Sequence, residues 1–229
     1  MNLSGLITVE PTDRERIEHA IALLGDSFLE EMWFATWLEA IDETGADDER
    51  KKTLLRAVFA DDVEAFSPYG SIYLLEDMTA AVGGYRFSEL QGETLSSIES
   101  RQAGRHFLAE ASAQEAALLE RRERDMEPIS SFDWAREHAG GDHINFFAWA
   151  VDEKARGKGS LRRALDPFFA YADEHELNCY LECYADRLQS MYEHLGFELI
   201  DELHADGFDV YERRMVRYPK QTARAAHTA

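Results

Sequence analysis

One short segment constrains the fold of this chain more than any other. It reads VDEKARGKGSL over residues 151–161, and it lies between an apolar run at 143–151 and a helix-like run at 161–174. A strand, a turn and a helix start in this order are typical of an anion site. The first N–H groups of a helix lack intrahelical partners, and the helix dipole adds partial positive charge there. Gly157 and Gly159 let the backbone close around an anion without a Cβ in the way.

The charge of this segment contrasts with that of the whole chain. The 229 residues include 45 acidic and 24 basic side chains, which gives a formal net charge of -21. Residues 154–162 nevertheless carry four basic residues within nine positions: Lys154, Arg156, Lys158 and Arg162. The segment therefore predicts a local polyanion site, most economically for a cofactor pyrophosphate. The acidic balance elsewhere argues against nucleic-acid or anionic-membrane binding, which needs a broad basic face. It fits a cationic substrate such as an amine, or a role in solubility alone.

Length and composition indicate one large domain or two small ones. Hydrophobic residues make up 45% of the chain, which is ample for a core. No apolar run approaches the roughly 20 residues of a membrane span, and the first residues lack the pattern of a secretory signal. Cys179 and Cys183 are interpreted as buried thiols of a reducing compartment rather than a disulfide framework. We therefore expect a cytoplasmic protein.

The first 90 residues predict helices followed by a hairpin. After a short strand at 6–9, the predicted helices lie between Thr12 and Gly25, at 28–41 and at 47–59, and the hairpin strands at 71–76 and 80–87. Gly83-Gly84 in the second hairpin strand predicts a bulge or a close backbone approach. Trp33 and Trp37 in the second helix favour a core, and the alternative is an aromatic wall of an acceptor pocket.

The middle of the chain differs in character from its flanks. Residues 102–124 predict one helix rich in Ala, Glu, Arg and Leu, and an aromatic element surrounds Trp134. We interpret residues 91–141 as a helical insertion between two strands of one sheet, and this segment could equally cap an active-site cleft. Residues 1–218 then form a single domain, and 219–229 a disordered tail.

A strand–helix rhythm predicts the remainder of the fold. The expected strands lie at 143–151, 178–184, 197–203 and 208–216, and the expected helices at 161–174 and 186–195. Strands joined by helices favour a mainly parallel α/β sheet in this half, with an antiparallel pair at the end. An exposed final strand could pair with a second subunit to form a homodimer.

A second motif follows the anion-binding segment by about 30 residues. It reads YEHLGF over 192–197. With Val151 and the loop at 156–161, it resembles the GCN5-related N-acetyltransferase (GNAT) superfamily. That family's loop reads Arg/Gln-x-x-Gly-x-Gly/Ala after a strand ending in Val, and its later segment reads Tyr-x-x-x-Gly-Phe. The stretch PFFAYADEHELNCYLE is similar to the puromycin acetyltransferase-like branch. Neither a Gly-x4-Gly-Lys-Ser/Thr pattern nor a GxGxxG pattern occurs.

The resemblance implies an α/β GNAT fold with a mixed, twisted central sheet flanked by helices. It implies an enzyme that transfers acetyl from acetyl-CoA to an amine of a small molecule or peptide, by direct attack in a ternary complex and without a metal. Tyr192 would protonate the departing thiolate, and the alternative is a tyrosine that only packs on the sheet. The implied cofactor contacts are Trp149, Ala150 and Val151 on the strand and Arg156, Gly157, Lys158, Gly159, Ser160 and Leu161 in the loop.

Three positions depart from the family pattern. Leu161 replaces the last Gly/Ala of the loop, which implies a helix farther from the sheet, and Ala185 stands where the family often has Asn. Asn145 occupies the place of a glutamate base found in some members, so a base must come from elsewhere or act through water, unless the amine arrives neutral and needs none. The candidates are His143, whose reference pKa lies near 6.5, and Glu182, whose pKa burial would raise. Each also fits a structural role.

The amino-acid sequence leaves two other functions open. One is a non-catalytic acyl-CoA-binding or sensing module on the same fold, and the other is a protein that binds a different phosphate ligand such as a nucleotide. The histidines show no metal-ligand spacing. For the acceptor, Trp33, Trp37 and Trp134 are candidate aromatic walls.

Overall fold

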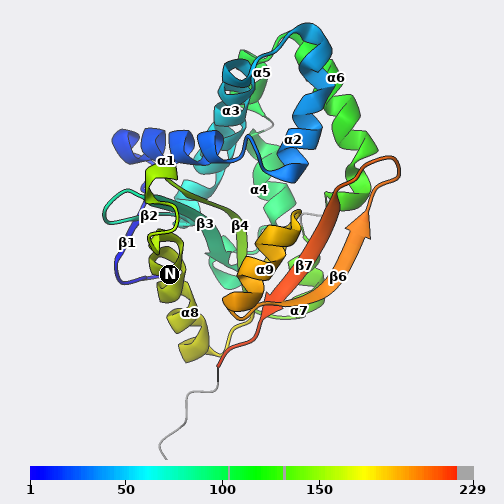
Figure 1. Cartoon of the computed structure of the whole chain (residues 1–229). Helices are drawn as coiled ribbons and strands as arrows, with labels where there is room; N and C mark the ends of the chain where they lie inside the picture. The colour runs from blue at the N-terminus through cyan, green and yellow to red at the C-terminus, as the bar shows by residue number, and fades with distance from the viewer. Residues whose placement is uncertain (103, 131–132, 221–229) are drawn as a thin grey trace, which may run out of the picture.

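The structure, a computed structural model, describes residues 1–102, 104–130 and 133–220. The described residues form one seven-stranded sheet in the order β1-β2-β3-β4-β5-β7-β6, flanked by helices (Figure 1). The fold class expected from the resemblance is therefore confirmed. Residues 221–229 of the expected tail lie outside the described part of the chain. The strands are β1 (Leu6–Thr8), β2 (Ile72–Leu75), β3 (Ala80–Arg86), β4 (Ile144–Val151), β5 (Cys179–Cys183), β6 (Glu198–His204) and β7 (Tyr211–Arg217).

The pairing of the strands corrects one expectation. Within the described residues only β4 and β5 pair in parallel, and every other neighbouring pair is antiparallel. A mainly parallel second half was wrong because β6 does not return to β5. It forms a hairpin with β7, and β7 takes the place beside β5. The final strand is consequently interior, and the edge strand on this side is β6.

A bulge bends β4, as the paired glycines predicted. Gly83 pairs with Ala148 and Gly84 with Phe146, so Phe147 is the extra residue on β4. A Cβ at Gly83 would lie 2.5 Å from the Phe147 ring, so the close approach requires glycine there. Because a bulge bends the strand that carries it, β4 changes direction at Phe147.

The bend separates β4 from β5. The two strands pair at Ile144–Cys179 and Asn145–Tyr180, whereas the pairing of β4 with β3 continues to Val151. The second half of β4 therefore keeps one hydrogen-bonding edge that β5 does not use. This edge lies where the candidate site forms.

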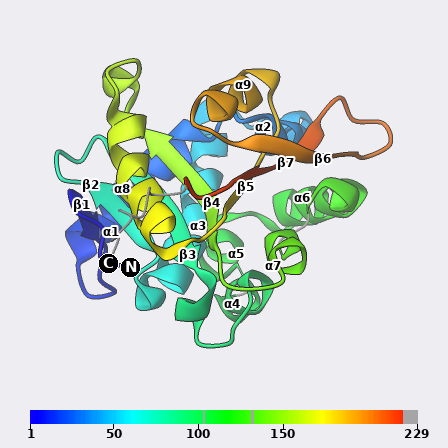
Figure 2. The ribbon, with the colours of Figure 1, turned by 90° about the horizontal axis from the view of Figure 1, so that it is seen from below.

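The helices cover both faces of the sheet (Figures 1 and 2). They are α1 (Arg14–Ser27), α2 (Met32–Leu38), α3 (Asp48–Phe66), α4 (Leu95–Gln102), α5 (Arg105–Glu110), α6 (Ala113–Asp125), α7 (Trp134–Ala139), α8 (Ser160–His175) and α9 (Asp186–His194). Helices α8 and α9 pack on one face of the sheet through residues such as Phe168 and Tyr192. Helices α1 and α3 pack on the other face through Leu24 and Phe59. None of the helices in the described part of the chain is long and apolar enough to cross a membrane.

The single helix expected at 102–124 is broken into shorter helices. Gly104 has a positive φ of 62°, and α5 begins after it. Ser112 then starts α6 with a capping box, in which its hydroxyl and the Glu115 carboxylate accept each other's backbone N–H groups. The composition favoured a continuous helix, but the backbone conformation of Gly104 and the capping box at Ser112 interrupt it.

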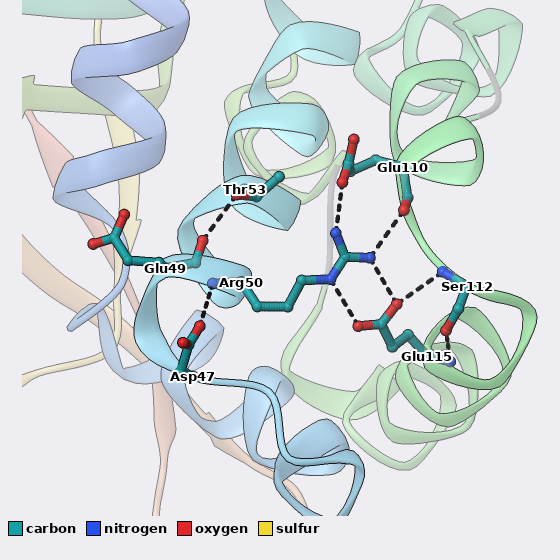
Figure 3. A network of polar contacts seen from close by, with 7 residues as sticks. All are labelled: Asp47, Glu49, Arg50, Thr53, Glu110, Ser112 and Glu115. Atoms are coloured by element: carbon teal, nitrogen blue, oxygen red, sulfur yellow. Dashed lines mark hydrogen bonds and ion pairs between the residues drawn. The ribbon is translucent and has the colours of Figure 1, made fainter.

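One ion network joins these helices to α3 (Figure 3). Arg50 of α3 donates to both carboxylate oxygens of Glu115, at 2.9 and 2.8 Å. It also donates to the side chain of Glu110 at 2.5 Å and to its carbonyl at 2.9 Å. The Arg50 hydrogen bonds hold the pKa of Glu115 at about 2. The network fixes α5 and α6 as a wall beside α3.

Candidate active site

A cleft of about 920 Å³ opens where β4 and β5 diverge. Its floor is the second half of β4 and the end of β5, and α9 and the 155–161 turn border it on one side. Residues of α2, α3, α4 and α6 line the other side. In Figure 1, α9 lies below α2 in the view. The cleft therefore joins both halves of the chain.

The turn before α8 forms one end of the cleft. Gly157 and Gly159 have φ values of 74° and 83°, in the left-handed region that favours glycine. No atom lies within 4 Å of the place where a Cβ would stand at either glycine. Helix α8 begins at Ser160 without a side-chain cap, so its first-turn N–H groups remain available to a ligand. This end of the cleft suits an anion.

Eight of the nine expected cofactor contacts line the cleft, and the exception is the exposed Lys158. The hydroxyl of Ser160 already lies 3.2 Å from that of Thr79, so its backbone amide is the group free to bind. Leu161 is half-buried, lines the cleft and packs against the core beneath α8. The eight residues are Trp149, Ala150, Val151, Arg156, Gly157, Gly159, Ser160 and Leu161.

Tyr192, on α9, lines the cleft. It is 3% exposed, and its hydroxyl accepts a hydrogen bond of 2.7 Å from the indole N–H of Trp149. Burial raises the pKa of Tyr192, and the bond from Trp149 opposes that shift. Since the indole supplies its own hydrogen, the phenolic proton is left to point at another acceptor. Two expected site residues are thus joined directly.

The two expected base candidates lie in different places. Glu182 lines the cleft and accepts a 3.0 Å hydrogen bond from the indole of Trp134. Burial, together with repulsion from Glu212, raises the pKa of Glu182 to about 8. His143 is fully buried, stacks on Phe87 and is not among the residues that line the cleft. Burial lowers its pKa. The structure brings Glu182 to Tyr192 but leaves His143 apart.

Glu31 is a cleft residue that the sequence reasoning missed. One carboxylate oxygen caps α2 by accepting the N–H groups of Trp33 and Phe34, at 3.0 and 3.1 Å. The other oxygen is buried and has no hydrogen-bond partner among the described residues. Burial raises the pKa of Glu31 to about 7, and its charge contributes to the raised pKa of Tyr192. The helix was predicted to begin at residue 28, which placed Glu31 inside it. Its position as the N-cap of α2, which would have marked this carboxylate as a candidate, was therefore not recognised.

Aromatic rings form the wall around Glu31. Phe28, Trp33 and Phe34 line the cleft, and the ring of Phe34 contacts both others at centroid distances of 5.4 and 5.1 Å. Trp37 reaches the cleft too, but it is 5% exposed and its indole donates to the carbonyl of Leu119. Trp134 is not in the lining. Of the three expected tryptophans, Trp33 is the one best placed to meet a ligand.

Comparison with known proteins agrees with this architecture. No family model matches the chain. A Schizosaccharomyces pombe protein described as an uncharacterized N-acetyltransferase is 31% identical over 91 residues, which are 38% of this chain and 37% of the relative. The match thus spans little more than a third of the relative's length.

Solved structures of low sequence identity share the fold over nearly the whole chain. A Corynebacterium glutamicum structure described as histone acetyltransferase HPA2 and related acetyltransferase is 15% identical, with a TM-score of 0.56 and coverage of 97% of this chain and 99% of that one. Drosophila melanogaster polyamine N-acetyltransferase is 13% identical, with a TM-score of 0.51 over 93% and 98%. The C-terminal condensation domain of Ebony is 11% identical, with a TM-score of 0.58 over 95% and 100%.

The fold is that of the GNAT acetyltransferases. The resemblance of the 151–161 and 192–197 motifs to this superfamily is therefore confirmed at the level of the fold. The finer resemblance to the puromycin acetyltransferase-like branch stays a prediction.

Proposed function

We propose that this protein is an N-acetyltransferase that moves an acetyl group from acetyl-CoA to an amine of a small molecule or peptide. The observation that carries the proposal is one cleft that holds three features together. These are an unpaired strand edge on β4, an uncapped helix N-terminus behind a glycine turn, and the buried hydroxyl of Tyr192. The donor supplies the acetyl group, and the chain supplies binding, orientation and proton transfer.

The residues of β4 and of the turn before α8 suit acetyl-CoA, the proposed acetyl donor. The free edge of β4 at Trp149 and Val151 offers N–H and C=O groups to the amides of a pantetheine arm, much as an added strand would, while Ala150 between them is in register with Ala81 of β3 and lines the cleft. The first-turn amides of α8 and the side chain of Arg156 suit a pyrophosphate. Residues 1–218 act as one domain in this proposal, and the helices at 91–141 supply part of the acceptor wall.

Proton transfer falls to two residues on opposite sides of the cleft. An alkylammonium loses two protons when it becomes an amide. Glu31, with an unpartnered oxygen and a pKa of about 7, takes the first and passes it to water. As the new C–N bond forms and the C–S bond breaks, Tyr192 gives its proton to sulfur, and the second proton of the amine restores the phenol. Glu182 is a weaker candidate for this base because its pKa of about 8 leaves it mostly protonated at pH 7.

The experiment combines calorimetric titration of CoA with a thiol-release assay against a panel of amines. Tyr192→Phe should keep CoA binding and lower kcat by about a hundredfold or more, within the range of general-acid contributions. A melting curve of the variant checks the fold, because the indole of Trp149 loses its acceptor. Absence of CoA binding at millimolar ligand would overturn the proposal.

A non-catalytic acyl-CoA sensor is the second candidate. It is favoured by Asn145, which is buried in the family's base position and is not among the cleft residues. A sensor would bind CoA and release no thiol with any amine. A nucleotide-binding protein, in contrast, would let ATP displace CoA. Both cysteines are buried free thiols, which is compatible with action in the cytoplasm.

A further inference from the structure

One wall of the cleft carries carboxylates that no basic side chain neutralises. Asp62 of α3, Glu99 of α4 and Glu123 of α6 all line the cleft. Within the described residues, their carboxylates make no hydrogen bond and no ion pair. The basic side chains in the lining are Arg156, Arg162 and Arg187, which come from the turn, α8 and α9. The cleft is thus positive at its donor end and negative at its acceptor end.

These carboxylates lie close enough to affect one another. Burial, together with the charge of Asp61, raises the pKa of Asp62 to about 7. Burial also raises the pKa of Glu99 well above its ordinary value, and the charges of Asp62 and Glu123 add to the shift. Asp62 and Glu99 are half-buried in the cleft, where like charges without a cationic partner raise the free energy of the folded protein. A cation at this wall would remove that penalty.

Two further observations at the same wall point to a ligand. The buried oxygen of Glu31 that lacks a partner borders the cleft, so the acidic wall includes an acceptor that only a ligand or solvent can satisfy. The rings of Phe28, Trp33 and Phe34 border the cleft beside it. Aromatic faces attract organic cations and pack against methylene groups. An acidic wall with aromatic rings suits an alkyl chain that carries positive charge.

The spacing of the carboxylates also bears on the kind of cation. No three acidic, cysteine or histidine side chains of the described residues come together as a group that could hold a metal ion. The carboxylates come instead from three helices, α3, α4 and α6, that line a cleft of about 920 Å³. This arrangement fits an extended molecule with separated positive charges.

We propose that the acceptor is a diamine or polyamine, in which one nitrogen reacts beside Tyr192 and a second, cationic nitrogen binds Asp62 and Glu99. The inference rests on the proposed function, because it assigns the substrate class of the same cleft. The methylene chain between the nitrogens lies against the aromatic wall. The second charge provides specificity, since a monoamine of equal length leaves the two carboxylates unpaired.

The experiment compares putrescine with n-butylamine, which has the same carbon chain and one amine, in the thiol-release assay. Asp62→Asn and Glu99→Gln are nearly isosteric and remove one charge each. Glu18→Gln is the matched control, because Glu18 is exposed on α1 and does not line the cleft. We expect the wild type to prefer putrescine by at least about tenfold in kcat/KM. Each cleft variant should raise the KM for putrescine by about tenfold to a hundredfold.

The same variants should leave the KM values for n-butylamine and acetyl-CoA unchanged, and Glu18→Gln should change none of them. Melting curves check the fold, and both cleft variants should melt at or above the wild-type temperature because a repelling charge is gone. Equal use of the two amines, or a putrescine KM that neither cleft variant raises, overturns the inference while the acetyl transfer stands. A lysine peptide used better than putrescine overturns it as well.

A second measurement separates the inference from the proposed function. If no amine releases thiol, the proposed enzyme fails, and calorimetric titration of spermidine into the wild-type protein with CoA present still tests the site. We then expect spermidine to bind, and the Asp62→Asn/Glu99→Gln protein to bind it at least about tenfold more weakly. No spermidine binding, or equal binding by both proteins, overturns the inference.

Discussion

The Arg50–Glu115 network allows a prediction worked from the geometry. Glu115→Gln removes a carboxylate that is 6% exposed and accepts two hydrogen bonds from Arg50. The pKa of Glu115 falls from its ordinary 4.5 to about 2. At 1.36 kcal/mol per pH unit, a difference of about 2.5 corresponds to about 3 kcal/mol. Arg50 is 29% exposed on its side chain, and screening by water reduces the expected loss of unfolding free energy to about 2 kcal/mol.

The stabilisation by Glu115 depends on pH, and the direction of that dependence follows from its pKa. Because the folded pKa lies below the unfolded one, the stabilisation is complete above pH 4.5 and is lost as the pH falls from about 4.5 through about 2. Urea unfolding should therefore separate the wild type from Glu115→Gln by about 2 kcal/mol at pH 7 and by much less at pH 3. Glu120→Gln, in the same helix and exposed, should stay within about 0.5 kcal/mol of the wild type. A difference that is the same at both pH values would refute the reasoning.

The network also has a functional consequence. Phe107 of α5 and Glu123 of α6 line the side of the cleft that we propose binds the acceptor. Glu115→Gln should loosen these helices, raise the KM for the amine and leave the KM for acetyl-CoA unchanged. The proposed acetyl-CoA site is formed by β4 and α8, which the network does not contact. Thiol-release kinetics with each substrate varied in turn measure the two constants separately.

Three further substitutions test other parts of the site. Trp149→Phe removes the N–H that orients the hydroxyl of the α9 tyrosine, and kcat should fall about tenfold in the thiol-release assay while the protein still folds. Gly83→Ala places a Cβ 2.5 Å from the Phe147 ring and should lower the unfolding free energy by about 1–3 kcal/mol in urea. Arg156→Ala should weaken CoA binding in calorimetry by about tenfold, whereas Lys158→Ala, whose side chain lies outside the lining, should weaken it less; equal losses would contradict the assigned contacts.

Features that depend on neighbouring residues could be predicted from the sequence. The glycine turn at 157–159 and the helix after it follow from backbone geometry within a few positions, and Gly83-Gly84 indicated the bulge whose extra residue, Phe147, lies on β4. The hydrogen bond between Trp149 and Tyr192 depends on two elements 43 positions apart, and only the family resemblance placed both residues in one site. Local signals thus predicted the end of the cleft that we propose binds the donor.

The acceptor end could not be predicted because its properties come from burial and long-range packing. Asp62 and Glu99 look like ordinary polar positions of helices, and only the fold places them in one wall. The prediction of a mainly parallel sheet failed for the same reason, since the sequence does not show that β7 lies between β5 and β6. His143 shares strand parity with Trp149, yet the bulge at Phe147 intervenes, and His143 packs on Phe87 instead.

Glu31 leads to the last prediction, which concerns the pH dependence of turnover. Its pKa is raised to about 7, first by burial, while the N–H groups of Trp33 and Phe34 oppose the shift. A general base must be ionised to accept a proton, so kcat should rise as the pH increases through about 7 and then level off. Glu31→Gln keeps an oxygen that can cap α2 but cannot take a proton at neutral pH. It should lower kcat by about a hundredfold and abolish the rise near pH 7.

A matched control separates base catalysis from simple loss of charge. Glu30→Gln removes the neighbouring exposed carboxylate, which also borders the cleft, and it should keep the pH profile. If Glu31→Gln retained the rise near pH 7, the ionisation would belong to another group, and Glu182 with its pKa of about 8 would be the next to test.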